Sequence, residues 1–121
     1  MYTFFIDEND LLNHTHLPVA DLLNDACNTD IIGFVTNLNN RVGSSYNYAS
    51  GTFWTDMDIF AQSQIPKFDG LLIDTEGGDE IIISLRELAH YLEIIYTRLE
   101  TAQFRDLSKL RYLLDEFEKK I

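Results

Sequence analysis

Apolar residues recur at the three- and four-residue spacing of amphipathic helices in the first part of the chain. Pro18 suits the first turn of a helix, and the apolar positions around it predict a helix over about 18–27. Thr29 or Asp30 can cap a second helix that ends near the Asn-Asn-Arg-Val-Gly segment closing at Gly43. The apolar face of this second helix comprises Ile31, Ile32, Phe34, Val35 and Leu38.

The pattern changes to that of a β-hairpin in the second half. Two β-prone runs, Phe-Asp-Gly-Leu-Leu-Ile-Asp and Glu-Ile-Ile-Ile-Ser, are joined by a Glu-Gly-Gly-Asp turn. Paired glycines supply the positive φ values that a tight turn needs. We therefore expect a two-stranded antiparallel unit over about 69–84.

A capped helix follows the hairpin directly. Ser84 and Glu87 have the spacing of a capping box, in which each side chain accepts from the backbone N–H of the other residue. Leucines, isoleucines and Tyr96 then continue an apolar face to about residue 100, and a last helix is expected over 103–119. The leucine faces of these two helices suit the core of the domain or, alternatively, a homodimer seam.

The remaining segments lack a sustained period. The Tyr-Thr-Phe-Phe-Ile run at 2–6 predicts an edge strand, and the Asp- and Asn-rich stretch after it predicts a loop. Residues 43–67 predict a long loop with one short strand around 52–55. Such a loop is either functional or an irregular segment pinned to the core by aromatic and aliphatic side chains. The pinning side chains expected are Phe53, Trp54, Ile59 and Phe60.

Together these elements predict an α+β fold, with a small antiparallel sheet packed against two N-terminal and two C-terminal helices. The length of 121 residues suits a single domain spanning 1–121, and 45% hydrophobic residues argue against disorder. No apolar run is long enough for a bilayer, and the start lacks a basic signal-peptide region, so a cytoplasmic protein is expected. The single cysteine, Cys27, excludes an internal disulfide and is expected to be a small buried hydrophobe.

The charge balance is strongly acidic. The chain has 20 acidic and 9 basic residues, a formal net charge of -11. A protein of this charge repels nucleic acid and anionic membranes, so neither is an expected partner. The acidity either serves solubility alone or indicates a basic partner.

The hairpin turn concentrates carboxylates, namely Asp74, Glu76, Asp79 and Glu80. They either keep a solvated hairpin tip from associating through its strand edge or contact a basic protein directly.

Asp56 and Asp58 have the Asp-x-Asp spacing that can hold Mg²⁺, because two oxygen ligands on one strand face can share a cation. No glycine-rich phosphate loop accompanies them, and with Phe53 and Trp54 they also suit an acidic, aromatic recognition loop.

The histidines and serines carry weak chemical signals. His14 and His16 lack a third ligand and are expected at the surface, and His90 is expected to flank the core. No serine lies in a nucleophile elbow. We therefore expect no enzyme, no metal and no cofactor.

The C-terminal half combines Phe-Asp-Gly at 68–70, an apolar strand, an acidic turn, the strand Asp-Glu-Ile-Ile-Ile-Ser at 79–84, the Tyr-Leu pair at 91–92 and a leucine-rich last helix. With these features it resembles the immunity proteins of bacterial contact-dependent growth inhibition systems that guard against ribonuclease toxins. The N-terminal half matches in outline, through Leu-Pro-Val at 17–19 and an aromatic, glycine-containing middle. The turn departs from the family by inserting two glycines among its carboxylates.

This resemblance implies a single immunity-protein domain that binds and neutralises the C-terminal nuclease domain of the toxin. The carboxylates would then meet the cationic surface of an enzyme built to bind RNA. The candidate contact residues are Trp54, Asp56, Asp58, Asp69, Asp74, Glu76, Asp79 and Glu80.

Two other hypotheses compete with this one. The chain is alternatively a small acidic adaptor or regulatory module that binds another basic protein or itself. The enzymatic alternative is a Mg²⁺-dependent hydrolase using Asp56 and Asp58.

Overall fold

A computed structural model of the chain describes all residues, 1–121, and has the predicted α+β architecture. The helices are α1 (Leu17–Thr29), α2 (Ile31–Asn39), α3 (Ile59–Gln64), α4 (Leu85–Thr101) and α5 (Leu107–Lys119). The strands are β1 (Ser44–Ser45), β2 (Ala49–Thr52), β3 (Leu71–Thr75) and β4 (Glu80–Ile83). They form one antiparallel sheet in the order β1-β2-β3-β4, which extends the predicted hairpin by two strands.

The register of the sheet separates an inner from an outer face. Ile73 pairs with Ile81 and with Gly51, and Leu71 pairs with Ile83. Ile73, Leu71 and Ile83 are buried, because α1 packs on this side of β2 and β3. A Cβ atom on Gly51 would lie 2.9 Å from Leu71 Cδ2 and 3.2 Å from Leu22 Cδ2. The glycine therefore permits the close approach of α1 to the sheet.

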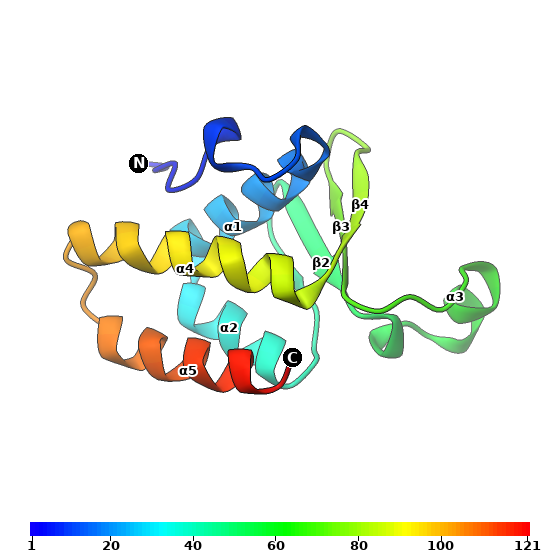
Figure 1. Cartoon of the computed structure of the whole chain (residues 1–121). Helices are drawn as coiled ribbons and strands as arrows, with labels where there is room; N and C mark the ends of the chain where they lie inside the picture. Colours follow the sequence, from blue (N-terminus) through cyan, green and yellow to red (C-terminus); the bar gives the residue numbers. More distant parts are fainter.

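Helices α1, α2, α4 and α5 gather on the inner side of the sheet (Figure 1). α5 packs against both α2 and α4, and their leucine faces, buried at Leu99, Leu110 and Leu114, belong to one continuous core with the strands. Tyr91, absent from the predicted apolar face, is fully buried in the same core.

The local signals for the helix starts are confirmed. Pro18 lies in the first turn of α1, and Asp30 caps α2 by accepting from Gly33 N at 2.9 Å. Ser84 and Glu87 form both hydrogen bonds of the capping box of α4. The last helix begins later than predicted, at Leu107, because residues up to Gln103 (φ 60°) close α4 in a turn.

The N-terminal run is not an edge strand. It is an extended segment whose backbone pairs with two asparagines one turn apart on α1. Asn24 accepts from Phe5 N and Ile6 N and donates to Ile6 O, while Asn28 bonds to both Thr3 N and Thr3 O. These side chains satisfy the backbone groups that a neighbouring strand would otherwise satisfy.

The prediction of a long loop over 43–67 is also wrong, because this segment contains β1, β2 and α3. The short strand predicted around 52–55 corresponds to β2 at Ala49–Thr52, and residues 54–56 form a 3-10 turn instead. Of the expected pinning side chains only Phe53 is buried. Ile59 and Phe60 are 86% and 75% exposed, and Trp54 is intermediate.

The histidine and cysteine environments differ from those expected. His16 is buried, and its Nδ1 lies 2.8 Å from the Tyr91 hydroxyl, which also accepts from Leu12 N. His14 is exposed as expected, whereas His90 is exposed instead of flanking the core. Cys27 is half-buried against the core, and burial raises the pKa of its thiol to about 12.

Candidate functional site

A groove of about 520 Å³ opens where the N-terminal segment, α1, the β1–β2 connection and the hairpin turn meet. Three aromatic and three acidic side chains line it, together with Thr75 and Gly77 of the turn. We call it the acidic aromatic groove, and its six defining residues are Tyr2, Phe4, Asp21, Tyr48, Glu76 and Asp79.

The aromatic side chains form a partly exposed cluster. Tyr2 contacts Phe4 and Tyr48 edge-on, with ring centroids 5.1 and 6.0 Å apart. Phe4 and Tyr48 remain 74% and 53% exposed. Such rings offer both apolar area and electron-rich faces to a ligand.

Asp25, buried on α1, holds this cluster in place. Its Oδ1 accepts from the Tyr2 hydroxyl at 2.7 Å, and its Oδ2 accepts from the backbone N–H groups of Tyr48 and Ala49 at 2.8 and 3.1 Å. Burial and then the hydrogen bond to Asp25 raise the pKa of Tyr2. One carboxylate thus ties the N-terminal segment and the β1–β2 connection to the helix.

The hairpin turn places Glu76 and Asp79 beside the aromatic rings. Glu76 N donates to Tyr48 O at 2.8 Å, which extends the β2–β3 pairing by one bond into the turn. Gly78 has a φ of 90°, so the turn needs one of its two glycines for conformation.

Asp21 lies one helical turn before Asp25 and faces the same groove. Partial desolvation, and then the negative charges of Asp25 and Asp79, raise the pKa of its carboxyl group. A bound cation would offset the two nearby negative charges, which are the smaller causes of this raised pKa.

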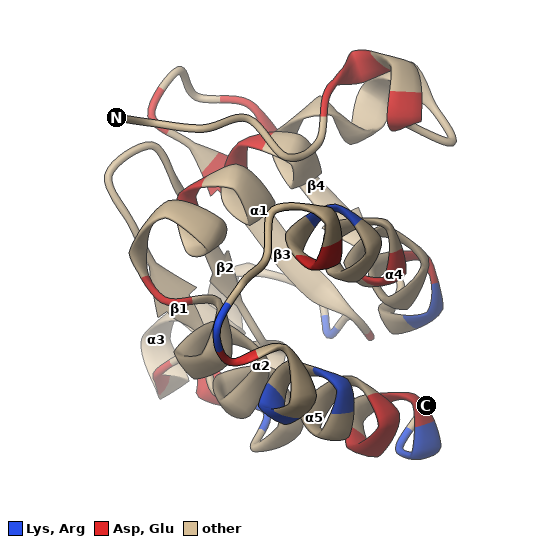
Figure 2. Ribbon diagram, turned by 90° about the vertical axis from the view of Figure 1, so that its left-hand side faces the viewer, with Lys and Arg blue, Asp and Glu red and all other residues tan.

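No basic residue balances the groove. The chain contains no Lys or Arg in residues 1–40 or 68–85, and the groove carboxylates make no ion pair. Lys and Arg instead cluster on α4, α5 and the C-terminal end, while the N-terminal part carries acids (Figure 2).

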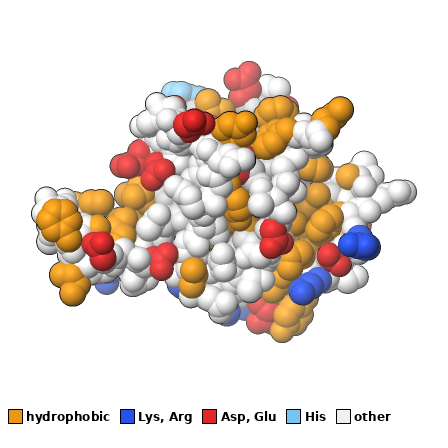
Figure 3. Space-filling view, turned by 180° about the vertical axis from the view of Figure 1, so that it is seen from behind, with side chains coloured by type: hydrophobic (Ala, Val, Ile, Leu, Met, Phe, Trp, Pro, Cys, Tyr) orange, Lys and Arg blue, Asp and Glu red, His pale blue; other side chains and the backbone are white.

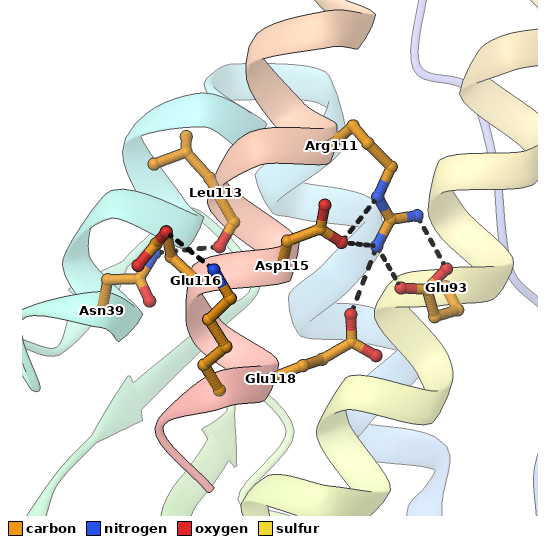
Figure 4. Close-up of polar contacts among 8 residues, drawn as sticks. Asn39, Glu93, Arg111, Leu113, Asp115, Glu116 and Glu118 are labelled. Carbon is orange, nitrogen blue, oxygen red and sulfur yellow. Dashed lines mark hydrogen bonds and ion pairs between the residues drawn. The ribbon is translucent and has the colours of Figure 1, made fainter.

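Three acids on the α4–α5 side share one cationic partner. Arg111 contacts Glu93, Asp115 and Glu118 (Figure 4), and its guanidinium group also lies over the ring of Tyr96. Its hydrogen bond to Glu93 lowers the pKa of that carboxyl group. The groove carboxylates, in contrast to these three, have no cationic partner within the chain.

The structure distributes the eight sequence-predicted contact residues over three places. Only Glu76 and Asp79 line the groove. Asp74 and Glu80 pair across β3 and β4 on the outer face of the sheet, where Ser50 Oγ donates to Asp74 at 2.9 Å. The other four belong to the excursion between β2 and β3, namely Trp54, Asp56, Asp58 and Asp69.

We call this excursion, residues 53–70, the arm, and α3 projects on it away from the helices (Figure 1). Asp56 accepts from Gly43 N at 2.8 Å, and Asp58 caps α3 by accepting from Ala61 N at 2.8 Å. Each carboxylate of the Asp-x-Asp motif thus already serves a backbone N–H. The chain has no group of three or more His, Cys, Asp or Glu side chains placed to hold a metal ion.

The sequence interpretation missed Tyr2, Phe4, Asp21 and Tyr48. Tyr46 packs near Phe34 and Tyr48 is 53% exposed, but both lie in the connection between β1 and β2, where no strand alternation distinguishes them. No local signal separates Asp21 from the other acids, because its neighbours come from distant segments.

No family model, curated protein or solved structure matches this chain. None of its helices is long and apolar enough to span a membrane. The groove itself suits a Lys or Arg side chain, because aromatic faces attract cations and carboxylates bind them through charge-assisted hydrogen bonds.

Proposed function

We propose that this chain is a non-catalytic binding protein that neutralises a basic ribonuclease in the cytoplasm. Its sequence resemblance suggests the immunity proteins of contact-dependent growth inhibition toxins as the particular class. The observation that supports the proposal is the acidic aromatic groove, where Asp21, Glu76 and Asp79 lack any cationic partner.

The chemistry of a ribonuclease explains why such a groove would inhibit one. An enzyme that binds RNA presents Lys, Arg or His to phosphate groups, and these cations complement the potential of the groove. Carboxylates would take the place of phosphates, and the aromatic rings would supply the desolvated centre that usually dominates binding energy.

The test is to purify the nuclease domain encoded beside this gene and measure its binding to two variants of equal net charge. Glu76→Gln with Asp79→Asn removes two groove carboxylates. Glu100→Gln with Asp106→Asn removes two exposed carboxylates that make no ion pair. We expect the groove variant to bind roughly 10- to 100-fold more weakly and the control to bind nearly as tightly as the wild type.

Co-expression provides the cellular readout. Wild type and the control variant should restore growth of cells producing the nuclease domain, and the groove variant should restore it less. Failure of the wild type to bind or to protect would refute the proposal. Equal loss in both variants would show that overall charge, and not the groove, drives binding.

A further inference from the structure

The end of the arm exposes two adjacent apolar side chains. Ile59 and Phe60, which we call the arm tip, begin α3 and are 86% and 75% exposed. Single exposed apolar residues are common on protein surfaces, but these two are adjacent and stand on a projecting segment. They contribute little to the core, so the stability of the fold does not explain them.

Hydrogen bonds within the arm hold the arm tip in a defined orientation. Gln62 Nε2 donates to Trp54 O at 3.0 Å, and Trp54 Nε1 donates to Ile65 O at 3.4 Å. The Asp58 cap closes the N-terminal end of α3, and the bond from Gly43 N to Asp56 ties the turn before α3 to the residue that precedes β1. An isolated helix of six residues is unstable in water, so these bonds are what keep it folded. A binding element held in this way loses less conformational entropy when a partner covers it.

The charges around the arm tip indicate the kind of partner. The arm carries three carboxylates, on Asp56, Asp58 and Asp69, and a single base, Lys67, which lies over the Trp54 ring. A second copy of this chain would bring these acids, and a net charge of -11, against an equally acidic molecule. A basic partner is favoured instead.

The arm tip and the groove lie beyond the two ends of the β2–β3 pair, since Tyr48 and Glu76 flank one end and the arm connects the strands at the other. Figure 3 shows hydrophobic side chains at the end of the projecting arm and a second hydrophobic group at the upper edge, with carboxylates between them. The Lys and Arg side chains visible in this view are few and lie along its lower edge and at the margin opposite the arm.

We propose that the arm tip is a second anchor for the same basic partner, inserting Ile59 and Phe60 into an apolar pocket bordered by Lys or Arg side chains. The inference rests on the proposed function, and it assigns the apolar part of the binding energy to the arm and the ionic part to the groove. Asp56 and Asp58 then act mainly by positioning the arm tip, in contrast to the direct contacts predicted from the sequence.

Calorimetric titration of the purified nuclease domain tests the second anchor. Ile59→Ser with Phe60→Ser should weaken binding at least about 100-fold, because burying each side chain contributes on the order of 1.5–3 kcal/mol. Phe60→Leu should retain most of the affinity. Tyr112→Ser, at an aromatic residue 63% exposed on α5, is the matched control and should leave binding unchanged.

Two further measurements separate the possible outcomes. The thermal melting of the arm variant should equal that of the wild type, because both side chains are exposed, so a loss of binding is not a loss of folding. Raising the salt concentration should weaken nuclease binding by the wild type and by the arm variant by the same factor, since the arm contact is apolar.

Each other outcome counts against a named part of the inference. Tight wild-type binding with an unchanged arm variant would overturn the second anchor and leave the proposed function intact. No wild-type binding would overturn both. A wild type that sediments as a dimer, with a monomeric arm variant, would show that a second copy covers the arm tip and would also overturn the inference.

Discussion

At the scale of single residues, Asp21 and Asp25 show how neighbours set the role of a carboxylate. They lie four residues apart on α1. Asp25 is buried and accepts three hydrogen bonds, whereas Asp21 accepts none and faces the negative charges of Asp25 and Asp79. One carboxylate ties three segments together and the other has no hydrogen-bond partner, although the residue type and the helix are the same.

The raised pKa of Asp21 predicts a pH-dependent gain of stability in Asp21→Asn. The folded chain holds this proton more tightly than the unfolded chain, so the free energy of unfolding falls as the pH rises from the ordinary aspartate value through the folded one. Asp21→Asn should therefore be more stable at pH 7, by less than about 1 kcal/mol at this exposed position, and the gain should vanish below about pH 4. Urea denaturation at both pH values measures it.

Asp10 supplies a control of opposite sign. The hydrogen bonds from Arg98 lower the pKa of Asp10 to about 2, so its contribution to stability is complete above the ordinary value and is lost as the pH falls toward 2. Asp10→Asn should lose about 1 kcal/mol at pH 7, allowing for screening by solvent. If both variants shifted stability in the same direction, the local charge balance described for the groove would be incorrect.

At the scale of elements, the hairpin depends on glycines for different reasons. Gly70 has a φ of 93°, and a Cβ atom there would lie 2.2 Å from Ile83 O. Gly78 has a φ of 90° with open space around it, and Gly77 has neither constraint. The glycine pair in the turn is thus not equivalent, although the sequence shows two identical residues.

These differences predict a graded series of alanine variants. Gly70→Ala should cost about 2 kcal/mol or more, Gly78→Ala about 1 kcal/mol, and Gly77→Ala less than about 0.5 kcal/mol. Urea denaturation of the three variants checks the order. A Gly77→Ala cost equal to that of Gly70→Ala would mean that the turn conformation differs from the one described.

Elements with strong local signals were predictable, and those held by distant groups were not. Pro18, Asp30 and the Ser84–Glu87 box set the starts of three helices through bonds within a few residues. The segment at 2–6 carries a strand pattern, yet the asparagines of α1 hold it away from the sheet. The prediction that apolar side chains pin the arm to the core failed for the same reason, because their burial depends on where the segment projects.

At the scale of the whole molecule, the charge is segregated. On α4 and α5, Arg111 pairs with Glu93, Asp115 and Glu118, while the acids of the groove and of the arm make no ion pair. The surplus charge repels itself in the folded state and is screened by salt.

Moderate salt should therefore stabilise the protein. Raising sodium chloride from about 10 to 200 mM shortens the Debye length from about 30 to below 10 Å, and the melting temperature should rise by a few degrees. The melting temperature of Glu100→Gln with Asp106→Asn, whose net charge is -9 instead of -11, should rise less with the same increase in salt. A falling melting temperature would show that ion pairs such as Arg98–Asp10 outweigh the repulsion.

The sequence by itself determined the α+β class, most helix boundaries, the hairpin and the acidity, because each depends on local pattern, capping or composition. Only the tertiary structure decided which acids remain without a partner and which apolar residues face solvent. Asp21, Glu76 and Tyr2 come from three segments, and Ile59 and Phe60 are exposed because the arm projects from the sheet. Burial and charge pairing depend on neighbours in space, and no local pattern records them.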